Sequence, residues 1–203
     1  MSSQRSLFAT PVHCATIDGA AGLNDEIETT ALSYAQEDDL GQRWCAEHGY
    51  PGYTSYGSVQ DLPARAPCFG ALKKRLDFEA AAFSKALAFD LGRGRLKLDG
   101  MWVNVMERGG VHSGHIHPHS VISGTYYARA PKGASSIRFE DPRLAMMMAA
   151  PPRRDDAPES LRNFVYLAPQ EGAVLMWESW LRHEVMRHAS RRPRISVSFN
   201  YRW

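Results

Sequence analysis

The sequence contains few cysteines and no long apolar run. Its three cysteines, Cys14, Cys45 and Cys68, are an odd number and include no CxxC pair. This disfavours both a disulfide framework and a thiolate zinc site, and it predicts reduced thiols in a cytoplasmic protein. No stretch approaches the roughly 20 apolar residues that a membrane-spanning helix needs. The first residues also lack the apolar segment of a secretion signal, so we expect no membrane association.

A strong excess of charge of one sign is also missing. Lysine and arginine together number 24 and aspartate and glutamate 22, so neither a nucleic acid nor an anionic membrane is indicated as a partner. The one basic run, residues 187–194, is short and is expected to be a solvated loop. The length of 203 residues suits a single domain with a sizeable core.

Helices are expected in the N-terminal part, residues 1–94. Apolar residues recur at helical spacing over residues 23–39, where Asn24 can serve as N-cap. The same spacing over residues 68–92 predicts a longer helix, with Gly92 as a plausible C-cap. We expect both helices to cover the outside of a sheet.

Three other segments are expected to be irregular or to lie at an edge. Residues 5–18 include a short apolar and β-branched stretch that suits an edge strand. Residues 46–65 are rich in Gly, Pro, Ser and Tyr and indicate an extended loop with turns. Residues 144–163 form a long loop rich in proline and charge. Its methionines, Met146–Met148, could form a lid or a self-association patch. A self-association patch would give a homodimer.

From residue 95 onward the pattern changes to a period of two. Residues 96–108 alternate, with Met101, Val103 and Val105 on one side, and six further short segments follow, each bounded by turn residues. Strands in succession without intervening helices favour an antiparallel sandwich or barrel. We therefore predict a single domain over residues 1–203, with an α-rich N-terminal part packed on a β core at 95–203.

The stretch GGVHSGHIHPHSVISGTYY, residues 109–127, contains four of the eight histidines. Residues i and i+2 of a strand point to the same face, so His115 and His117 can share a metal ion. A third ligand must come from elsewhere, and His183 on a later strand is the natural candidate. Antiparallel strands that are distant in sequence can bring it within the ~2 Å that imidazole coordination requires.

A close pair of histidines plus a distant one, all on strands, is typical of double-stranded β-helix enzymes. The predicted fold class is thus mainly β with flanking α: a double-stranded β-helix (jelly roll, cupin-like) with the N-terminal helices outside the sheet. In non-haem iron oxygenases three ligands on one face leave the opposite positions open. Imidazole donors suit Fe(II), and zinc fits three histidines equally well.

Three further histidines lie close in sequence to His115, His117 and His183. His119 is a rival to His117, because Pro118 between them can bend the strand and bring either one inward. His112 and His188 lie next to glycine or in basic loops and are expected to be exposed.

The last predicted strand has an apolar and a polar face. The apolar face carries Ile195, Val197, Phe199 and Tyr201, and the polar face carries Arg194, Ser196, Ser198 and Asn200. A buried polar face is costly unless it meets polar partners. Arg194, with the Ser196 hydroxyl two residues on, can grip a carboxylate bidentately, as the far carboxylate of a 2-oxoacid would require.

Further side chains are candidates for the same pocket or for the core. Asn104 and Tyr127 carry groups suited to lining a cosubstrate pocket, although the strand phase leaves core packing open for each. Trp102, Trp177 and Trp180 are expected to be core aromatics.

Several motifs occur in a specific order. They are W-x-N (102–104), H-x-H-P-x-S-x-x-S-G-x-Y-Y (115–127), F-x-D-P-R (139–143), P-x-x-G-x-x-x-x-W (169–177), W-L-x-H-x-V (180–185) and R-I-S-x-S-F-N (194–200). Together they resemble the iron(II)/2-oxoglutarate-dependent oxygenase superfamily and, more narrowly, a family of bacterial 2OG-Fe(II) oxygenases. The resemblance is strong over residues 95–203 and weaker before them.

The resemblance implies roles for particular residues. His115 and His183 match the first and last ligands of the family's HxD/E…H triad, and His117 takes the place of the carboxylate. Arg194, with Ser196 beside it, matches the arginine that anchors 2-oxoglutarate. The implied cofactors are Fe(II) and 2-oxoglutarate. O₂ is the implied cosubstrate, and an unknown small molecule or peptide is hydroxylated with release of succinate and CO₂. No catalytic residue beyond the metal ligands is implied.

Two alternatives differ in their sequence requirements. A cupin-type metal enzyme that does not use 2-oxoglutarate agrees with the spacing from Gly109 to the histidines, but no glutamate follows His117 at the cupin distance. A non-catalytic module that binds a metal or a ligand is kept open by the unusual His117.

Overall fold

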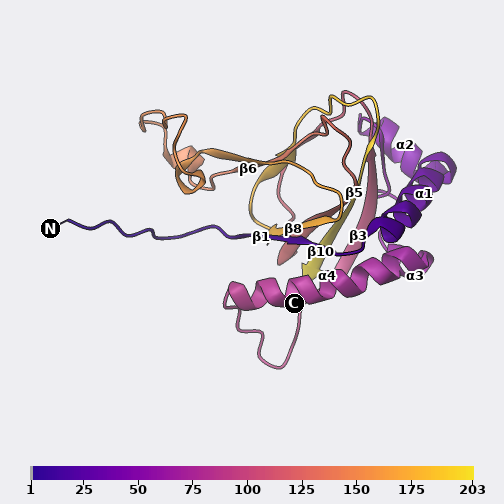
Figure 1. Ribbon diagram of the computed structural model, residues 1–203, viewed down its shortest axis with the longest axis horizontal. Coiled ribbons are helices and arrows are strands. Elements are labelled where there is room, and N and C mark those ends of the chain that lie inside the picture. The colour runs from indigo at the N-terminus through magenta and orange to yellow at the C-terminus, as the bar shows by residue number, and fades with distance from the viewer. Residues whose placement is uncertain (1) are drawn as a thin grey trace.

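The computed structural model describes residues 2–203 and contains two antiparallel sheets (Figure 1). The larger sheet has the order β1 (Val12–Thr16), β8 (Ala173–Glu178), β5 (Ile122–Arg129), β10 (Arg194–Arg202), β3 (Lys97–Met106) and β2 (Tyr53–Thr54). The smaller sheet has the order β4 (His112–His115), β9 (His183–Val185), β6 (Ile137–Glu140) and β7 (Phe164–Leu167). From β3 onward the chain passes repeatedly between the two sheets, as in a double-stranded β-helix, and the predicted fold class is confirmed.

The centre of the larger sheet is β10, which pairs with β3 on one side and β5 on the other. Its apolar residues Ile195, Val197 and Phe199 are completely buried in the main core cluster. The alternate residues Arg194 and Ser196 face the smaller sheet, where they line a pocket. The predicted division of this strand into an apolar and a polar face is confirmed.

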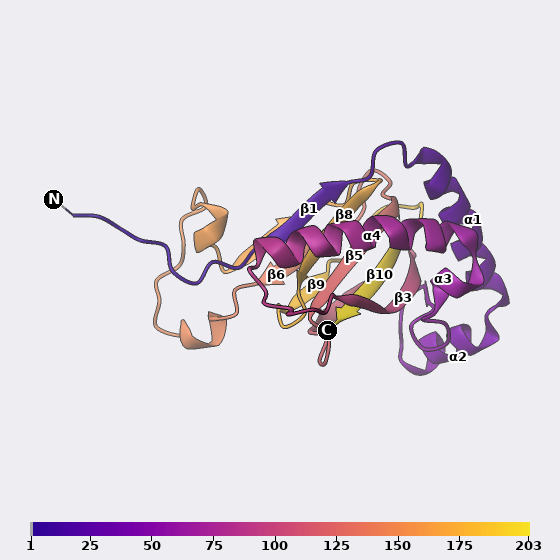
Figure 2. The ribbon, with the colours of Figure 1, turned by 90° about the horizontal axis from the view of Figure 1, so that it is seen from below.

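Four helices precede the jelly roll, and Figure 2 shows the longest of them running across the larger sheet. They are α1 (Ala21–Glu37), α2 (Asp39–Glu47), α3 (Leu62–Arg65) and α4 (Pro67–Ala86). Residues of α1 and α4 such as Ile27, Leu72 and Phe83 are buried in the same core cluster as the apolar face of β10. The helices therefore cover the outer face of the larger sheet, as predicted.

The predicted helix ends are wrong in two places. Helix α1 begins at Ala21, so Asn24 lies inside it, where its buried side chain accepts a hydrogen bond from the Tyr126 hydroxyl. A partner 102 residues away thus determines the role of Asn24. Helix α4 ends at Ala86, and the left-handed residue that closes it is Ala88 with φ 54°, not Gly92. The N–H of the following residue, Phe89, donates to the Ser84 carbonyl, and Phe89 packs on the core.

Helix α2 was not predicted, and residues 46–65 contain more structure than a loop. The Asp38 carboxylate accepts hydrogen bonds from the Gly41 N–H, at 3.0 Å, and from the Tyr53 hydroxyl, at 2.7 Å. It thus caps α2 and ties it to the residues of β2. The predicted loop also contains α3.

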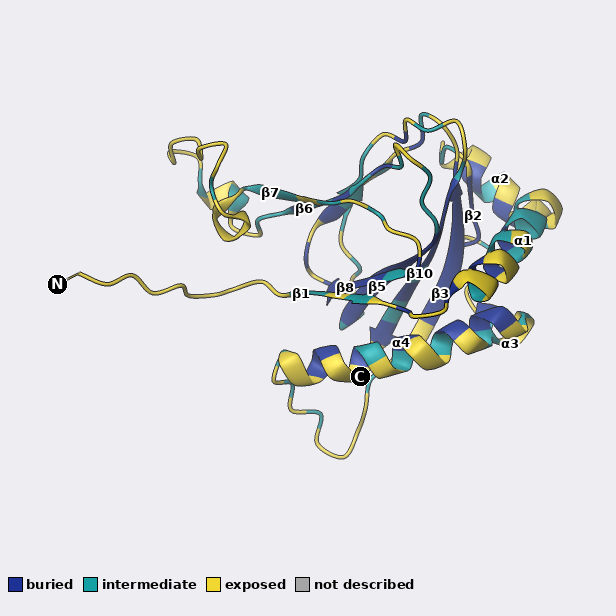
Figure 3. Cartoon of the chain, viewed as in Figure 1, coloured by how far each residue is buried: buried dark blue, intermediate teal, exposed yellow. Residues whose placement is uncertain are grey.

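Two segments extend from the body of the molecule, and Figure 3 shows both as exposed. Residues 2–11 precede β1, which is an edge strand as predicted. Residues 141–163 form the long loop between β6 and β7, with two short 3₁₀ turns, η1 (Leu144–Met146) and η2 (Glu159–Leu161). Met146 and Met148 in this loop are exposed. Among the described residues, no helix is both long enough and apolar enough to cross a membrane.

Candidate metal centre and cosubstrate pocket

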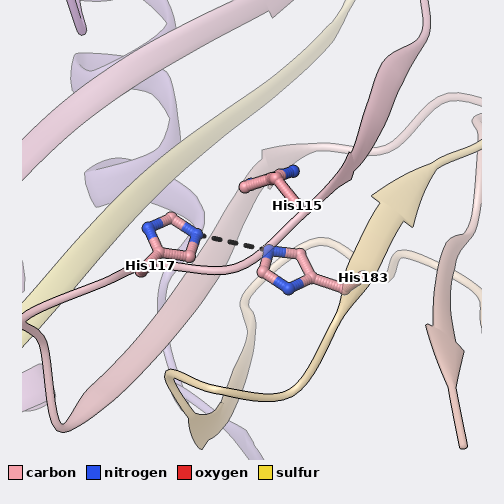
Figure 4. Close-up of side chains that lie close together, drawn as sticks. All are labelled: His115, His117 and His183. Carbon is pink, nitrogen blue, oxygen red and sulfur yellow. Dashed lines mark hydrogen bonds between the residues drawn. The ribbon is translucent and has the colours of Figure 1, made fainter. Parts of the chain in front are cut away.

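Three histidines converge between the two sheets (Figure 4). His115 is the last residue of β4 and lies directly opposite His183, the first residue of β9. His117 lies beyond the end of β4, where its N–H donates to the Ser179 carbonyl at 3.0 Å. The prediction that His115 and His117 share one strand is therefore wrong, because the chain leaves β4 after His115 and turns at Pro118 and His119, and Pro118 has no N–H to continue a ladder.

The ring nitrogens of the three histidines are oriented for a shared ion. Nδ1 of His115 donates to the Ser113 carbonyl at 2.8 Å, and Nδ1 of His183 donates to the Leu181 carbonyl at 2.9 Å. In the neutral form of both rings, Nε2 therefore carries the lone pair that can bind a metal. Nε2 of His117 lies 3.3 Å from Nε2 of His183, and the ligand atoms of all three lie within 4.8 Å of one another. Nitrogens about 2.1 Å from one ion would be about 3.0 to 3.4 Å apart at octahedral or tetrahedral angles, which is the spacing of the His117–His183 pair.

Burial keeps the three imidazoles neutral. Burial, together with the neighbouring His115, lowers the pKa of His183 to about 2 and that of His117 to about 4. Burial also lowers the pKa of His115. The neutral ring is the form that binds a metal, so the rings are ready to bind at ordinary pH.

The structure places the other histidines of the stretch differently from one another. His119 is exposed, with φ 71°, and lies outside the cluster. His112, expected to be exposed, is half-buried and stacks on the His115 ring with 4.4 Å between centroids. Its other neighbour is Tyr50, which meets it edge-on at 5.5 Å. No sequence signal points to His112, because it meets Tyr50 only through the fold.

His188 is also not exposed, contrary to expectation. It is completely buried, and Nε2 donates to the Arg192 carbonyl at 2.8 Å. Its main chain exchanges two hydrogen bonds with Gly109 and Gly110, at 2.7 and 2.8 Å. The two loops beside Arg194 are thus tied together through His188, which the local sequence does not indicate.

Arg194 lies in the same pocket as the three histidines. It is 2% exposed, its Nη1 donates to the Ser196 hydroxyl at 3.3 Å, and its guanidinium carbon lies 4.9 Å from the centre of the Tyr127 ring. Its Nε has no hydrogen-bond partner among the residues that the structure describes. A buried guanidinium without a counter-ion is costly, and its planar donors suit a carboxylate.

The other two predicted pocket residues have distinct environments. Asn104 lines the pocket, and its amide accepts from the Thr54 hydroxyl at 2.8 Å and donates to Ser198 at 3.0 Å. Tyr127 is completely buried under Arg194, and its hydroxyl has no partner within residues 2–203. Asn104 therefore forms part of the pocket wall, and Tyr127 supports the guanidinium from below.

The three tryptophans that were expected in the core differ from one another. Trp102 and Trp177 are buried as predicted, and both also line the pocket. Trp180 is 46% exposed, so the expectation of a core position is wrong. It lies in the turn between β8 and β9, outside the alternation that would bury one of its faces.

Unpaired polar atoms gather at this pocket. Within the described part of the chain, four buried side-chain atoms lack a hydrogen-bond partner: Thr125 Oγ1, Tyr127 Oη, Trp177 Nε1 and Arg194 Nε. Thr125, Trp177 and Arg194 line the pocket, and Tyr127 packs against Arg194. Buried polar groups normally have partners, so the pocket is built for a polar occupant as well as a metal.

Residues 100–200 match the family model described as "Putative 2OG-Fe(II) oxygenase". With this match the chain belongs to the 2OG-Fe(II) oxygenase family. The matched range, about half of the chain, contains all three histidines and Arg194. The expected family and enzyme class are thereby confirmed, and Fe(II) and 2-oxoglutarate, the expected cofactors, are those of this family. None of the curated proteins compared with the chain matches it.

Solved structures of low sequence identity share the fold. A prolyl-4-hydroxylase from Pseudomonas putida is 13% identical, with a TM-score of 0.64 over 96% of this chain and 94% of its own. AviO1 from Streptomyces viridochromogenes Tue57 is 14% identical, with a TM-score of 0.64 over 96% of this chain and 90% of its own. HygX from Streptomyces hygroscopicus, solved with nickel and 2-oxoglutarate, is 15% identical, with a TM-score of 0.58 over 95% and 81%.

Proposed function

We propose that His115, His117 and His183 hold the Fe(II) of this oxygenase and that Arg194 and Ser196 hold the distal carboxylate of 2-oxoglutarate. The observation that carries the proposal is the convergence of three ring nitrogens within 4.8 Å in a pocket that also contains a buried arginine, which has no counter-ion in the described part of the chain. A metal and a dicarboxylate would satisfy both features at once.

The protein's own groups fix the orientation of this site. The carbonyls of Ser113 and Leu181 hold the rings of His115 and His183 so that Nε2 faces inward. The Trp177 ring packs edge-on against His183, with 4.6 Å between centroids, and limits its movement. Two ligands are thus pre-oriented before an ion binds.

Residues around Arg194 complete the cosubstrate pocket in this proposal. Tyr127 supports the guanidinium through its ring face, and the Ser196 hydroxyl provides a further donor beside it. Asn104 forms the wall on the neighbouring strand. Bound Fe(II) would supply the oxidative chemistry that uses O₂ and 2-oxoglutarate, releases succinate and CO₂ and hydroxylates the substrate.

The substrate is a small molecule or a peptide in this proposal. Residues 50–56 are placed to contribute to substrate binding, because Tyr56 lies edge-on to Trp102 at 5.2 Å and Trp102 lies 6.1 Å from His117. The proposal of a single domain over residues 1–203 is supported by the core cluster that α1 and α4 share with the jelly roll. Three free cysteines are in keeping with a cytoplasmic location.

An anaerobic titration with Fe(II) and then 2-oxoglutarate tests the assignment. We expect the weak visible charge-transfer band of a chelated 2-oxoacid, and succinate after O₂ is admitted. His183→Ala should lose the metal, whereas Arg194→Ala should keep the metal and lose 2-oxoglutarate. Arg191→Ala, at an exposed arginine three residues away, serves as the matched control.

Two results would contradict the proposal. Iron bound at full stoichiometry in His183→Ala would refute the ligand set. A bound metal without the 2-oxoacid band or succinate would favour a cupin-type metal enzyme or a binding module instead.

A further inference from the structure

One tyrosine of the α-rich N-terminal part lines the metal pocket. Tyr50 lies in the loop between α2 and β2, outside the part of the chain that matches the family model, yet it lines the same pocket as the three histidines and Arg194. Its N–H donates to the Cys45 carbonyl at 2.8 Å, which ties the loop to α2. Its ring meets the His112 ring edge-on, with 5.5 Å between centroids. These contacts hold the Tyr50 side chain at the pocket.

Two glycines beside Tyr50 allow the loop to take this path. Gly49 has φ 60° and Gly52 has φ 102°, both in the left-handed region that side chains other than glycine rarely adopt. A Cβ atom at Gly52 would also collide with the Val105 carbonyl oxygen of β3. The loop therefore passes directly against the strand that carries Asn104, and Tyr50 is placed over the inner side of the jelly roll.

The Tyr50 hydroxyl has no good acceptor within residues 2–203. It lies 3.5 Å from Asn104 Oδ1, at the limit of a hydrogen bond, and that oxygen already accepts from the Thr54 hydroxyl at 2.8 Å. No aspartate or glutamate of the described residues lines the pocket. Burial raises the pKa of Tyr50, so the hydroxyl keeps its proton and can donate. A strong acceptor for it must come from a bound molecule.

The surroundings of the hydroxyl are those of the carboxylate site in the proposed function. Asn104 on β3 lies directly opposite Ser196 on β10, and the Ser196 hydroxyl accepts from Arg194 Nη1 at 3.3 Å. Arg194 is also close enough for its positive charge to oppose the rise that burial causes in the pKa of Tyr50. The phenol and the guanidinium thus face the same end of the pocket from different parts of the chain.

We propose that the Tyr50 hydroxyl donates a hydrogen bond to the distal carboxylate of 2-oxoglutarate, beside Arg194 and Ser196. This inference rests on the proposed function. A hydrogen bond to a charged acceptor is stronger than one between neutral groups, so Tyr50 favours 2-oxoacids that carry a second carboxylate. The N-terminal part therefore determines cosubstrate specificity in addition to covering the sheet.

Two ligands that differ only at the distal end test this role. 2-Oxopentanoate has the carbon chain of 2-oxoglutarate with a methyl group in place of the distal carboxylate. Calorimetry on the anaerobic, Fe(II)-loaded protein measures the affinity for each. Tyr50→Phe should weaken 2-oxoglutarate binding at least about tenfold and 2-oxopentanoate binding less than about twofold, because it removes the donor and keeps the ring.

Tyr166→Phe is the matched control, at a tyrosine that is 52% exposed and does not line the pocket. It should bind both ligands within about twofold of the wild type. Iron content and thermal unfolding are measured for each variant, to show that it is loaded and folded.

Two results would overturn the inference. One is an unchanged affinity of Tyr50→Phe for 2-oxoglutarate while Arg194→Ala loses it. The other is an equal weakening of both ligands, which would mean that Tyr50 shapes the pocket without binding the carboxylate. A wild type that binds neither iron nor 2-oxoglutarate, or an Arg194→Ala variant that binds 2-oxoglutarate normally, would instead refute the underlying function.

Discussion

The two faces of β10 are buried in opposite ways. On the outer face, Ile195, Val197 and Phe199 are completely buried under the helices and have no polar atoms to satisfy. On the inner face Arg194 and Ser196 are almost as buried, yet Arg194 has no counter-ion among residues 2–203. The outer face stabilises the fold, whereas the inner face gives up stability to keep polar groups available for a ligand.

The largest effect is expected on the outer face. Phe199→Ala should lower the free energy of unfolding by about 3 to 5 kcal/mol, because it leaves a cavity between the sheet and the helices. Urea unfolding followed by circular dichroism measures this change. The folded fraction of the variant should still bind metal, and a loss of less than 1 kcal/mol would contradict the assignment of Phe199 to the stabilising core.

Metal binding should partly restore the stability that is lost by burying unpaired polar groups on the inner face of β10. Fe(II) at a hundred times its dissociation constant should raise the free energy of unfolding by about 2.7 kcal/mol, because only the folded state brings the three histidines together. Thermal unfolding with and without metal under anaerobic conditions measures this gain. His183→Ala should show no gain, and His119→Ala, at an exposed histidine outside the cluster, should show all of it.

Removing the buried charge should separate stability from ligand binding. Arg194→Met should raise the free energy of unfolding of the ligand-free protein by about 1 to 3 kcal/mol, because a guanidinium without a counter-ion gives way to an apolar chain. The same variant should no longer bind 2-oxoglutarate. Denaturant titration and calorimetry check the two effects, and a destabilised variant would mean that Arg194 serves mainly as a structural residue.

The pH dependence of stability should come from the site and not from the outer face. The pKa values of His183, His117 and His112 are lowered by burial to about 2, 4 and 3, from about 6.5 when unfolded. Because the unfolded chain then binds more protons than the folded protein, the free energy of unfolding of the metal-free protein has its full value above pH 6.5. It decreases as the pH falls below 6.5. Each of these histidines should contribute about 1 kcal/mol per pH unit.

Urea titrations at pH 7 and pH 5.5 test whether the free energy of unfolding decreases as the pH falls. His183→Phe should show a smaller loss than the wild type over that interval. The Phe199→Ala penalty should be the same at both pH values. A stability that rises as the pH falls would show that these rings are protonated in the folded state.

The period-two pattern was sufficient to predict β3 and β10 and to divide each of them into two faces, because alternation along a strand is a local property. Prediction was poorer where the chain leaves a strand. His117 and Trp180 lie in turns next to β4 and β9, and their directions follow from tertiary contacts such as the His117 N–H to the Ser179 carbonyl. Helix α2 was missed because Asp38, the residue that caps it, also binds the Tyr53 hydroxyl, which lies beyond the end of the helix.

The sequence by itself determined the fold class, the family and the kinds of donor available, since residue type and spacing carry that information. Only the tertiary structure decided which histidines converge. His117 and His183 are 66 residues apart, and their nitrogens meet because the two sheets face each other. The same holds for the missing counter-ion of Arg194. Whether a buried charge is paired depends on every element packed around it, and no local pattern records that.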